Sequence, residues 1–412
     1  MKYLKQNKIF CLLIALIVPI LILGPFFSDL IVSLSSLVFL IYVFKYKLFF
    51  YFKKKPLIIF FIFCIYCILV SIFVAKDILL SFKNSLFYFR IGVFSCLIWC
   101  LIEQNKKILT YFYYLLVISF FALIVDGYIQ FFTGTNTLGF LIQESRISSF
   151  FGDELIMGSY LSRLFPLLFA LFIVKEKKKF ELYSAILFFT LLSGLVLISG
   201  ERAAFFFYFL SFIFIIIFMN RYAKLKIALL VCSLIFIIII NLIFDQVKNR
   251  MLSEPKNNIT KFIIFTPAHD SLIRTAYNMF LDKPLVGHGP KMFRVICKDE
   301  KYATGMYPCM THPHNFYVQL LAETGIIGFS FLFSAFAYVM YCAYRQLKSM
   351  VLRQKRYLTD YQVCLLAGIL ITVWPITTNG NFFHNWLMIV YSLPVGFYLH
   401  SIYGKNRKNI SF

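Results

Sequence analysis

The chain has 412 residues, of which 61% are hydrophobic and only 14% are charged. Apolar stretches of about 20 residues recur along it, each long enough to cross a bilayer. Because they are continuous rather than alternating, they indicate a helical polytopic membrane protein and argue against a β-barrel or a set of soluble domains. The formal net charge of +23 would suit nucleic acid, but basic residues of membrane proteins collect beside anionic lipid. We therefore expect membrane lipids, and no nucleic acid, as partners.

The expected fold is all-α, with about twelve transmembrane helices. Nine fall within residues 1–244, a large polar loop occupies residues 245–314, and three fall within residues 315–412. The first, Ile9–Phe27, is followed by another span and not by a small-residue cleavage site, so a cleaved signal peptide is not expected. The predicted spans are about residues 9–27, 29–44, 57–75, 86–102, 108–132, 154–174, 181–199, 203–219, 227–244, 315–343, 361–378 and 384–403.

The distribution of basic residues predicts the orientation. With the N-terminus in the cytoplasm, every short cytoplasmic loop carries lysine or arginine, as in residues 53–55, and most of the 41 basic residues lie on that side. This follows the positive-inside rule and places both termini in the cytoplasm, while a long loop can cross regardless of its charge. Arg146, Arg202, the 245–314 loop and the 377–384 turn then lie on the outer face.

This orientation makes the polar chemistry of the protein extracytoplasmic. ATP, NAD and nucleotide-sugar pools are cytoplasmic, and the sequence contains neither a glycine-rich phosphate loop nor a GxGxxG motif. Any group that the protein transfers must therefore be activated already and reach it from outside or from the lipid. No cofactor is expected.

Two arginines are candidates for an anion site on the outer face. Arg202 interrupts two apolar spans with almost no loop between them, and a guanidinium at the hydrocarbon edge needs a partner. Either it pairs with Glu201 or snorkels to headgroups, or it holds an anionic lipid group through two parallel hydrogen bonds. Arg146, just before the sixth span, adds a second cation on the same face.

Arg163 lies inside the sixth predicted span, where a charge is costly. We expect it to face a cavity or a carboxylate, and Asp126 is one candidate. The same two residues at mid-membrane would suit a secondary transporter, which is the alternative from another class of protein. Transporters tend to show paired broken spans in two related halves, and the sequence has no visible internal repeat.

The large outer loop contains a predicted amphipathic helix at Asp270–Leu281, which ends in a turn at residues 284–290. One interpretation is an interfacial element packed on the membrane domain. The other adds Arg274, or His269 five residues earlier, to the cations of the outer face. The predicted apolar stripe comprises Leu272, Ile273, Ala276, Tyr277 and Phe280, with Arg274 off the stripe.

Cys297 and Cys309 lie in the outer loop, whereas the other eight cysteines fall within apolar spans or at their ends. Outside the cytoplasm such a pair is expected to be oxidised. We therefore predict a disulfide between them. A metal site is the weaker interpretation, because no Cys-x-x-Cys motif is present.

His312 and His314 stand where the outer loop enters a long apolar helix. Asn315 is a predicted N-cap of this helix, and Gly325 and Gly328 fall one turn apart, on a face that a neighbouring helix could approach closely. His314 can act as a base near neutral pH, and nearby arginines would disfavour its protonated form. His312 could do the same or orient its neighbour. The other interpretation is a loop-to-membrane junction without chemistry.

These residues resemble the O-antigen ligase and O-antigen polymerase superfamily of bacterial surface-polysaccharide glycosyltransferases, over roughly residues 140–335. The resemblance implies a GT-C-like helical fold. The motifs that carry it are His314-Asn315 with Gly325-x-x-Gly328, the run from Ala276 to Phe293 with its Pro284-Leu285-Val286-Gly287-x-Gly289-Pro290 turn, Arg146 with Phe151-Gly152, and Ser199-Gly200-x-Arg202.

The resemblance implies an inner-membrane enzyme whose donor is a glycan on undecaprenyl diphosphate at the periplasmic face. The acceptor is a lipid A-core sugar in the ligases and another lipid-linked glycan in the polymerases; oligosaccharyltransferases to protein belong to the same superfamily. Arginines matching Arg202 and one in the outer-loop helix would hold the diphosphate. The histidine matching His314 would deprotonate the acceptor hydroxyl, giving inverting displacement without a metal.

The sequence departs from the family pattern at one position. Relatives carry the outer-loop arginine about fifteen residues before the proline of the turn, and here that residue is His269. Arg274 lies about ten residues before the same proline. The outer-loop cation is therefore either Arg274 or His269.

Overall fold

The computed structural model describes residues 8–174, 177–252 and 266–405, and this part of the chain folds into helices without a named strand. The terminal segments 1–7 and 406–412, whose side of the membrane is predicted above, lie outside the described residues, as does part of the outer loop. The prediction of an all-helical polytopic membrane protein is confirmed.

Eight helical stretches of the described chain are long and apolar enough to cross a membrane. Most coincide closely with predicted spans. They are α4 (Pro25–Tyr46), α5 (Lys55–Phe73), α6 (Ile78–Leu86) together with α7 (Arg90–Gln104), α8 (Lys107–Thr133), α10 (Lys179–Ile198), α12 (Ala223–Ile243), α16 (Phe316–Val351) and α18 (Asn385–Tyr403).

Four shorter apolar stretches occupy the remaining predicted spans. At 1.5 Å per residue, a helix of 16 residues (about 24 Å) falls short of a hydrocarbon core of about 30 Å. Eight stretches of the described chain are thus long enough to cross completely, and the expected twelve is not confirmed. The shorter stretches are α2 (Lys8–Ala15) with α3 (Ile17–Ile20) and the 3₁₀ turn η1 (Leu21–Leu23), α9 (Met157–Phe172), α11 (Arg202–Phe218) and α17 (Asp360–Thr372).

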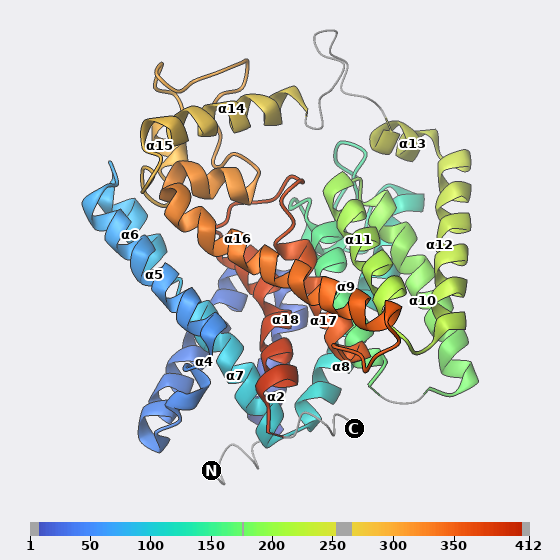
Figure 1. Ribbon diagram of the computed structural model, residues 1–412. Coiled ribbons are helices and arrows are strands. Elements are labelled where there is room, and N and C mark those ends of the chain that lie inside the picture. Colours follow the sequence, from blue (N-terminus) through green and yellow to red (C-terminus); the bar gives the residue numbers. More distant parts are fainter. Residues whose placement is uncertain (1–7, 175–176, 253–265, 406–412) are drawn as a thin grey trace.

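The polar elements gather at one end of the helical bundle. Figure 1 shows α13 (Asp245–Leu252), α14 (Pro267–Asp282) and α15 (Phe293–Ile296) along its upper edge, with α14 above the start of α16. Two short 3₁₀ turns, η2 (Phe49–Tyr51) and η3 (Ser149–Phe151), complete the described elements.

The outer loop has a small hydrophobic core of its own. Leu272, Ala276 and Met279 of α14 are fully buried against α15 and against Ala322 of α16. The amphipathic helix is thus confirmed, but its stripe is partly wrong, because Tyr277 is 51% exposed. The helix buries the positions that face the loop core, and Tyr277 points outward.

The helix α16 is broken at Gly325, whose backbone (φ +62°, ψ −168°) is not helical. The 284–289 turn inserts at the break. His288 and Gly289 donate their N–H groups to the carbonyls of Ala322 (3.1 Å) and Glu323 (2.7 Å). In the other direction, the N–H groups of residues 326 and 327 donate to the carbonyls of residues 284 (2.8 Å) and 285 (3.4 Å).

The predicted role of Gly325 and Gly328 as a helix-packing face is therefore wrong. A Cβ on Gly325 would lie 2.2 Å from the carbonyl oxygen of Leu285, and one on Gly287 would lie 2.5 Å from the carbonyl carbon of Glu323. The close approach is made by an extended turn and not by a neighbouring helix. The two motifs that looked separate in the sequence form one backbone junction.

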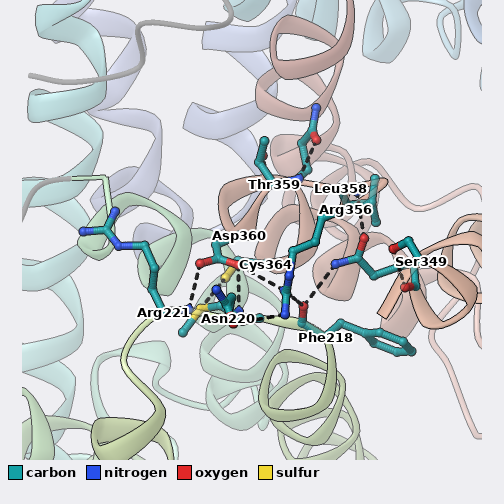
Figure 2. A network of polar contacts seen from close by, with 12 residues as sticks. Phe218, Asn220, Arg221, Ser349, Arg356, Leu358, Thr359, Asp360 and Cys364 are labelled. Carbon is teal, nitrogen blue, oxygen red and sulfur yellow. Dashed lines mark hydrogen bonds and ion pairs between the residues drawn. The ribbon is translucent and has the colours of Figure 1, made fainter. Parts of the chain in front are cut away.

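The opposite end of the bundle is held by a polar network between two connections, shown in Figure 2. Asp360 accepts hydrogen bonds from the backbone N–H groups of Asn220 (2.8 Å) and Arg221 (2.9 Å). Arg356 and Gln346 both donate to the carbonyl oxygen of Phe218, at 3.0 and 3.2 Å. These contacts fix the turn after α11 to the connection between α16 and α17, away from the histidines.

We expect Gly325→Ala to lower the free energy of unfolding by about 3 kcal/mol or more, since it adds a steric clash to a backbone conformation that only glycine adopts readily. Gly139→Ala is the matched control: its φ is +90°, but nothing lies within 4 Å of its Cβ position. Its cost should be about 1–2 kcal/mol. Thermal unfolding of the purified proteins in detergent measures both, and equal losses would contradict the docking of the turn at Gly325.

Candidate functional site

Three histidines from two elements meet at the polar end of the bundle. The ring of His314 lies 4.0 Å from that of His312 and 5.1 Å from that of His269, measured between ring centroids. His269 belongs to the first turn of α14, where Thr266 caps the helix and contacts the His269 Nδ1 at 2.7 Å. Thr311 contacts the Nδ1 of His312 at 2.9 Å, while the buried His312 Nε2 has no partner among the described residues.

The backbone of His314 is held in the left-handed region, with φ +56°. A non-glycine residue there is strained, and such strain persists only where the surroundings over-determine it. Asn379 donates its N–H to the His314 carbonyl oxygen at 2.7 Å. Asn315 caps α16, as predicted, by accepting from Tyr317 and Val318, and its amide also donates to the carbonyl oxygen of Pro375 at 2.8 Å.

The 373–384 segment is the platform under His314, and the buried side chain of Arg163 fixes it. Arg163 donates to Asn379 Oδ1 at 2.8 Å and to the Ile371 carbonyl oxygen, and its guanidinium stacks between Phe207 and Tyr391. Asp126 is not its partner. That carboxylate accepts instead from residues 136, 137 and 149. The two charged groups on which a transporter mechanism would depend are therefore engaged separately.

The histidines are kept neutral. Burial, and then the charge of His269, lowers the pKa of His314 to about 4. Burial, and then His314, lowers the pKa of His312 to about 3. At neutral pH both imidazoles hold a free nitrogen lone pair that can accept a proton. The predicted direction of the His314 shift is confirmed, but its cause is burial and a neighbouring histidine, and not arginine.

The predicted outer-face arginines lie in a second group. Arg202 donates through Nε (3.1 Å) and Nη2 (2.8 Å) to the carbonyl oxygen of Arg250, and Arg146 donates to the carbonyl oxygen of Leu155 at 2.5 Å. A Cβ on Gly200 would meet both the Arg146 and the Arg250 side chains. Arg146, Arg202 and Arg250 thus lie close together where α10 passes into α11. The Nε atoms of Arg146 and Arg250 are buried without a partner among the described residues.

Glu201 has a structural role in this group. Its carboxylate accepts from the N–H groups of Gly158 (2.6 Å) and Ser159 (3.2 Å) and from the Ser159 hydroxyl (2.6 Å). It therefore caps the first turn of α9, where a negative charge is favourable. The contacts of the Glu201 carboxylate are thus made with α9, and Arg202 contacts the carbonyl oxygen of Arg250.

The two candidates for the outer-loop cation occupy different faces of α14. Arg274 is exposed and pairs with Asp270 at 2.8 Å, one helical turn earlier. His269 faces inward and contacts His314. The departure from the family spacing thus places a histidine beside the candidate base and turns the arginine away from it.

Other polar residues of this region were not assigned to the site from the sequence. Lys291 and Arg294 follow the 284–290 turn. Burial, and then the positive charges of Lys291 and Arg294, lowers the pKa of His384 at the start of α18. Glu323, fully buried in α16, accepts from the Phe293 N–H at 3.1 Å and from Gln319 at 3.0 Å. An acidic residue within an apolar helix is rarely buried without a partner. The position of Glu323 in the sequence could therefore have indicated a polar contact at this point of α16.

Cys297 and Cys309 are joined in a disulfide, with their Cα atoms 5.0 Å apart. Cys297 belongs to the small core of the outer loop, and Cys309 lies three residues before His312. The bond therefore ties the approach to the histidines to α15. Within the described chain, no group of three or more His, Cys, Asp or Glu side chains is arranged to hold a metal ion.

Fold and site together define a multi-pass helical membrane protein with neutral histidines and converging arginines at one end of the bundle. The model of a family described as O-antigen ligase matches residues 186–333. This match supports membership in the O-antigen ligase and polymerase superfamily and indicates a glycosyltransferase-type enzyme. It contains Arg202, α14 and His314, whereas Arg146 and the 373–384 platform lie outside it. No curated protein matches the chain.

If His314 is the base, activity should persist in acid well below the ordinary histidine range. The neutral form exists above the folded pKa, so kcat/KM should fall only as the pH drops through about 4. His269→Ala should move this limit to higher pH, because the charge of His269 holds the pKa of His314 down. Transfer assays across pH with the purified protein measure the limit, and unfolding at each pH is the control. A limit near 6.5, the ordinary value, would contradict the burial of His314.

The disulfide should be detectable as a linked peptide by non-reducing mass spectrometry. Replacing Cys297 and Cys309 together by Ser should destabilise the outer loop by about 2–4 kcal/mol, since it frees a short closed loop. Limited proteolysis should then cut between residues 297 and 309. Cys232→Ser, which changes a free cysteine, is the control. Finding both thiols free in mature membranes would remove the disulfide.

Proposed function

We propose that the protein transfers a glycan from undecaprenyl diphosphate to a sugar hydroxyl at the outer, periplasmic face of the bacterial inner membrane. The observation that carries this proposal is the neutral, strained His314, which lies with His312 and His269 in a chain matched by the O-antigen ligase family model. Both termini are placed in the cytoplasm by the bias of basic residues. The histidines then face the periplasm.

In the proposed reaction, His314 takes the proton of the acceptor hydroxyl as its oxygen attacks the anomeric carbon of the donor. The bond from that carbon to the diphosphate oxygen breaks from the opposite side, so configuration is inverted, and the electron pair leaves with the diphosphate. A positioned base typically contributes about 10²–10⁴-fold. Stabilisation of the charge on the leaving group is usually the larger contribution.

The arginine group supports the proposed stabilisation of the leaving diphosphate. Arg202, Arg146 and Arg250 converge at the polar end, and Glu201, the acid among them, is committed to capping α9. Guanidinium forks suit phosphate because they donate two parallel hydrogen bonds. We assign Arg202 and Arg146 to the diphosphate of the donor. His312 and His269 flank the base, and we assign them to its environment.

The proposed function has two versions, ligase and polymerase, which differ in the acceptor. A ligase would use a lipid A-core sugar, and a polymerase would use a second lipid-linked glycan. Both need the same base and the same cations, so the chemistry is shared. The glycan that accumulates when the protein is absent separates them.

The test is the glycan profile of a strain that lacks the protein and carries the wild type, His314→Ala or Arg202→Ala, at matched membrane levels. Full-length polymer accumulating on the carrier, with bare lipid A-core, identifies the ligase. Single repeats on the core without long chains identify the polymerase. Each substitution should reproduce the deletion. Lys348→Ala, an exposed position near the far end of α16, should match the wild type. Wild-type profiles from both site variants would overturn the assignment of the site.

A further inference from the structure

Glu323 is a fully buried acid in α16, two residues before the break at Gly325. Its Oε1 accepts from the backbone N–H of Phe293 at 3.1 Å, and its Oε2 accepts from the side-chain amide of Gln319 at 3.0 Å. Both oxygens of the carboxylate are therefore used as acceptors, and both of these donors are neutral groups. A buried acid in a membrane helix is costly and by default marks a functional region, yet this one has no part in the proton transfer proposed for His314.

Gln319 connects this carboxylate to the platform. The same amide nitrogen donates to Asn381 Oδ1 at 3.0 Å, and the amide oxygen accepts from the N–H of Phe382 at 2.9 Å. The two hydrogens of the amide and its oxygen are thus all engaged, so the amide can take only one orientation. Gln319 is itself fully buried, and breaking either side of this link would leave polar atoms without partners.

The platform in turn holds the backbone of the candidate base. Asn379, two residues before Asn381, donates its N–H to the carbonyl oxygen of His314 at 2.7 Å, where the φ of His314 is +56°. This left-handed backbone persists only while its surroundings enforce it. A path of hydrogen bonds and two residues of platform backbone therefore joins α15, Glu323 and Gln319 to the strained residue.

The docking of the outer loop does not depend on the Glu323 side chain. The junction at the break is made by backbone groups, among them the Glu323 carbonyl oxygen, which accepts from the N–H of Gly289 at 2.7 Å. Replacing the side chain leaves these bonds in place. What the carboxylate adds is a link between the docked loop and the platform.

We propose that Glu323 and Gln319 are positioning residues for His314, which set the platform against the docked outer loop and so fix the candidate base where it meets the acceptor hydroxyl. The inference rests on the proposed function and extends it to two residues that act through the backbone of Asn379 rather than on the substrates.

Exchanging the two side chains tests this link. Glu323→Gln sets an amide nitrogen against the Gln319 amide nitrogen, and Gln319→Glu sets two carboxylates against each other. Each single change should lower kcat about tenfold to a hundredfold, because a misplacement of about 1 Å can cost this much, and should leave KM for the lipid-linked donor unchanged. The double exchange restores one donor and one acceptor at the pair, and should return kcat to within a few-fold of the wild type.

Asn381→Ala breaks the link on the platform side and leaves α16 unaltered, so it carries the test if a single exchange fails to fold. It should lower kcat in the same way, at unchanged KM. The matched control is Gln346, a fully buried glutamine near the far end of α16, which donates to the Phe218 carbonyl oxygen at 3.2 Å and accepts from the Leu358 N–H at 2.8 Å. Gln346→Glu should lower the unfolding temperature without changing kcat.

Titration of His314 separates this inference from the proposed function, since it needs no substrate. NMR of the protein with isotope-labelled histidine should show one signal, absent from His314→Ala, that titrates near pH 4, because burial and then His269 lower the pKa of His314 to about 4. In Glu323→Gln and Asn381→Ala that signal should titrate at higher pH, toward about 6.5, the ordinary value, because a misplaced ring is less buried. His312 and His269, the titratable side chains whose rings contact it, are unchanged.

The inference is overturned if the single changes keep both the kcat and the His314 titration of the wild type, if the double exchange restores neither, or if Gln346→Glu shifts them equally. A His314 titration that shifts as expected in a protein without glycan transfer would tell against the proposed activity alone.

Discussion

The break in α16 at Gly325 is the constraint on which the polar end depends. Where a membrane helix is interrupted, carbonyl and N–H groups lose their helical partners, and lipid hydrocarbon supplies neither water nor another hydrogen-bond partner in their place. Here residues 284–289 supply the missing partners, with four backbone hydrogen bonds in the two directions. The outer loop is thereby docked on the same helix whose N-terminus follows His314. The position of α14 and of His269 relative to the base is a consequence of that docking.

Base and cations are arranged so that each keeps the protonation state that it needs. The imidazoles of His312 and His314 are buried close together; besides burial, His314 disfavours the charged form of His312, and His269 disfavours the charged form of His314. Guanidinium groups remain charged in almost any setting, and those of Arg146, Arg202 and Arg250 lie in a separate group. A neutral proton acceptor can therefore coexist with fixed positive charges at one end of the bundle.

The sequence predicted the elements well and their junctions poorly. Hydropathy located the helices, and the position of Asn315 before an apolar run predicted that it caps α16. Both features depend on residues close together in the sequence. The left-handed backbone of His314 depends on Asn379, about sixty residues later, and no local pattern encodes it. Gly325 was assigned to helix packing because spacing along a helix shows a small residue but not what approaches it. Pairing of Glu201 with Arg202 was one alternative because the two are adjacent, whereas the contacts of Glu201 are with α9.

Arg163 has a consequence for how the protein is assembled. Its guanidinium is 97% buried within α9 and depends on the Ile371 carbonyl oxygen and on Asn379, both made some two hundred residues later during synthesis. Until α17 and the platform arrive, α9 carries a charge at membrane depth without these partners, at a cost of about 2.5–3.5 kcal/mol on insertion scales. The last two apolar helices therefore complete the burial of a cation inserted much earlier. The last step of assembly therefore packs α17 and the platform against α9, next to His314.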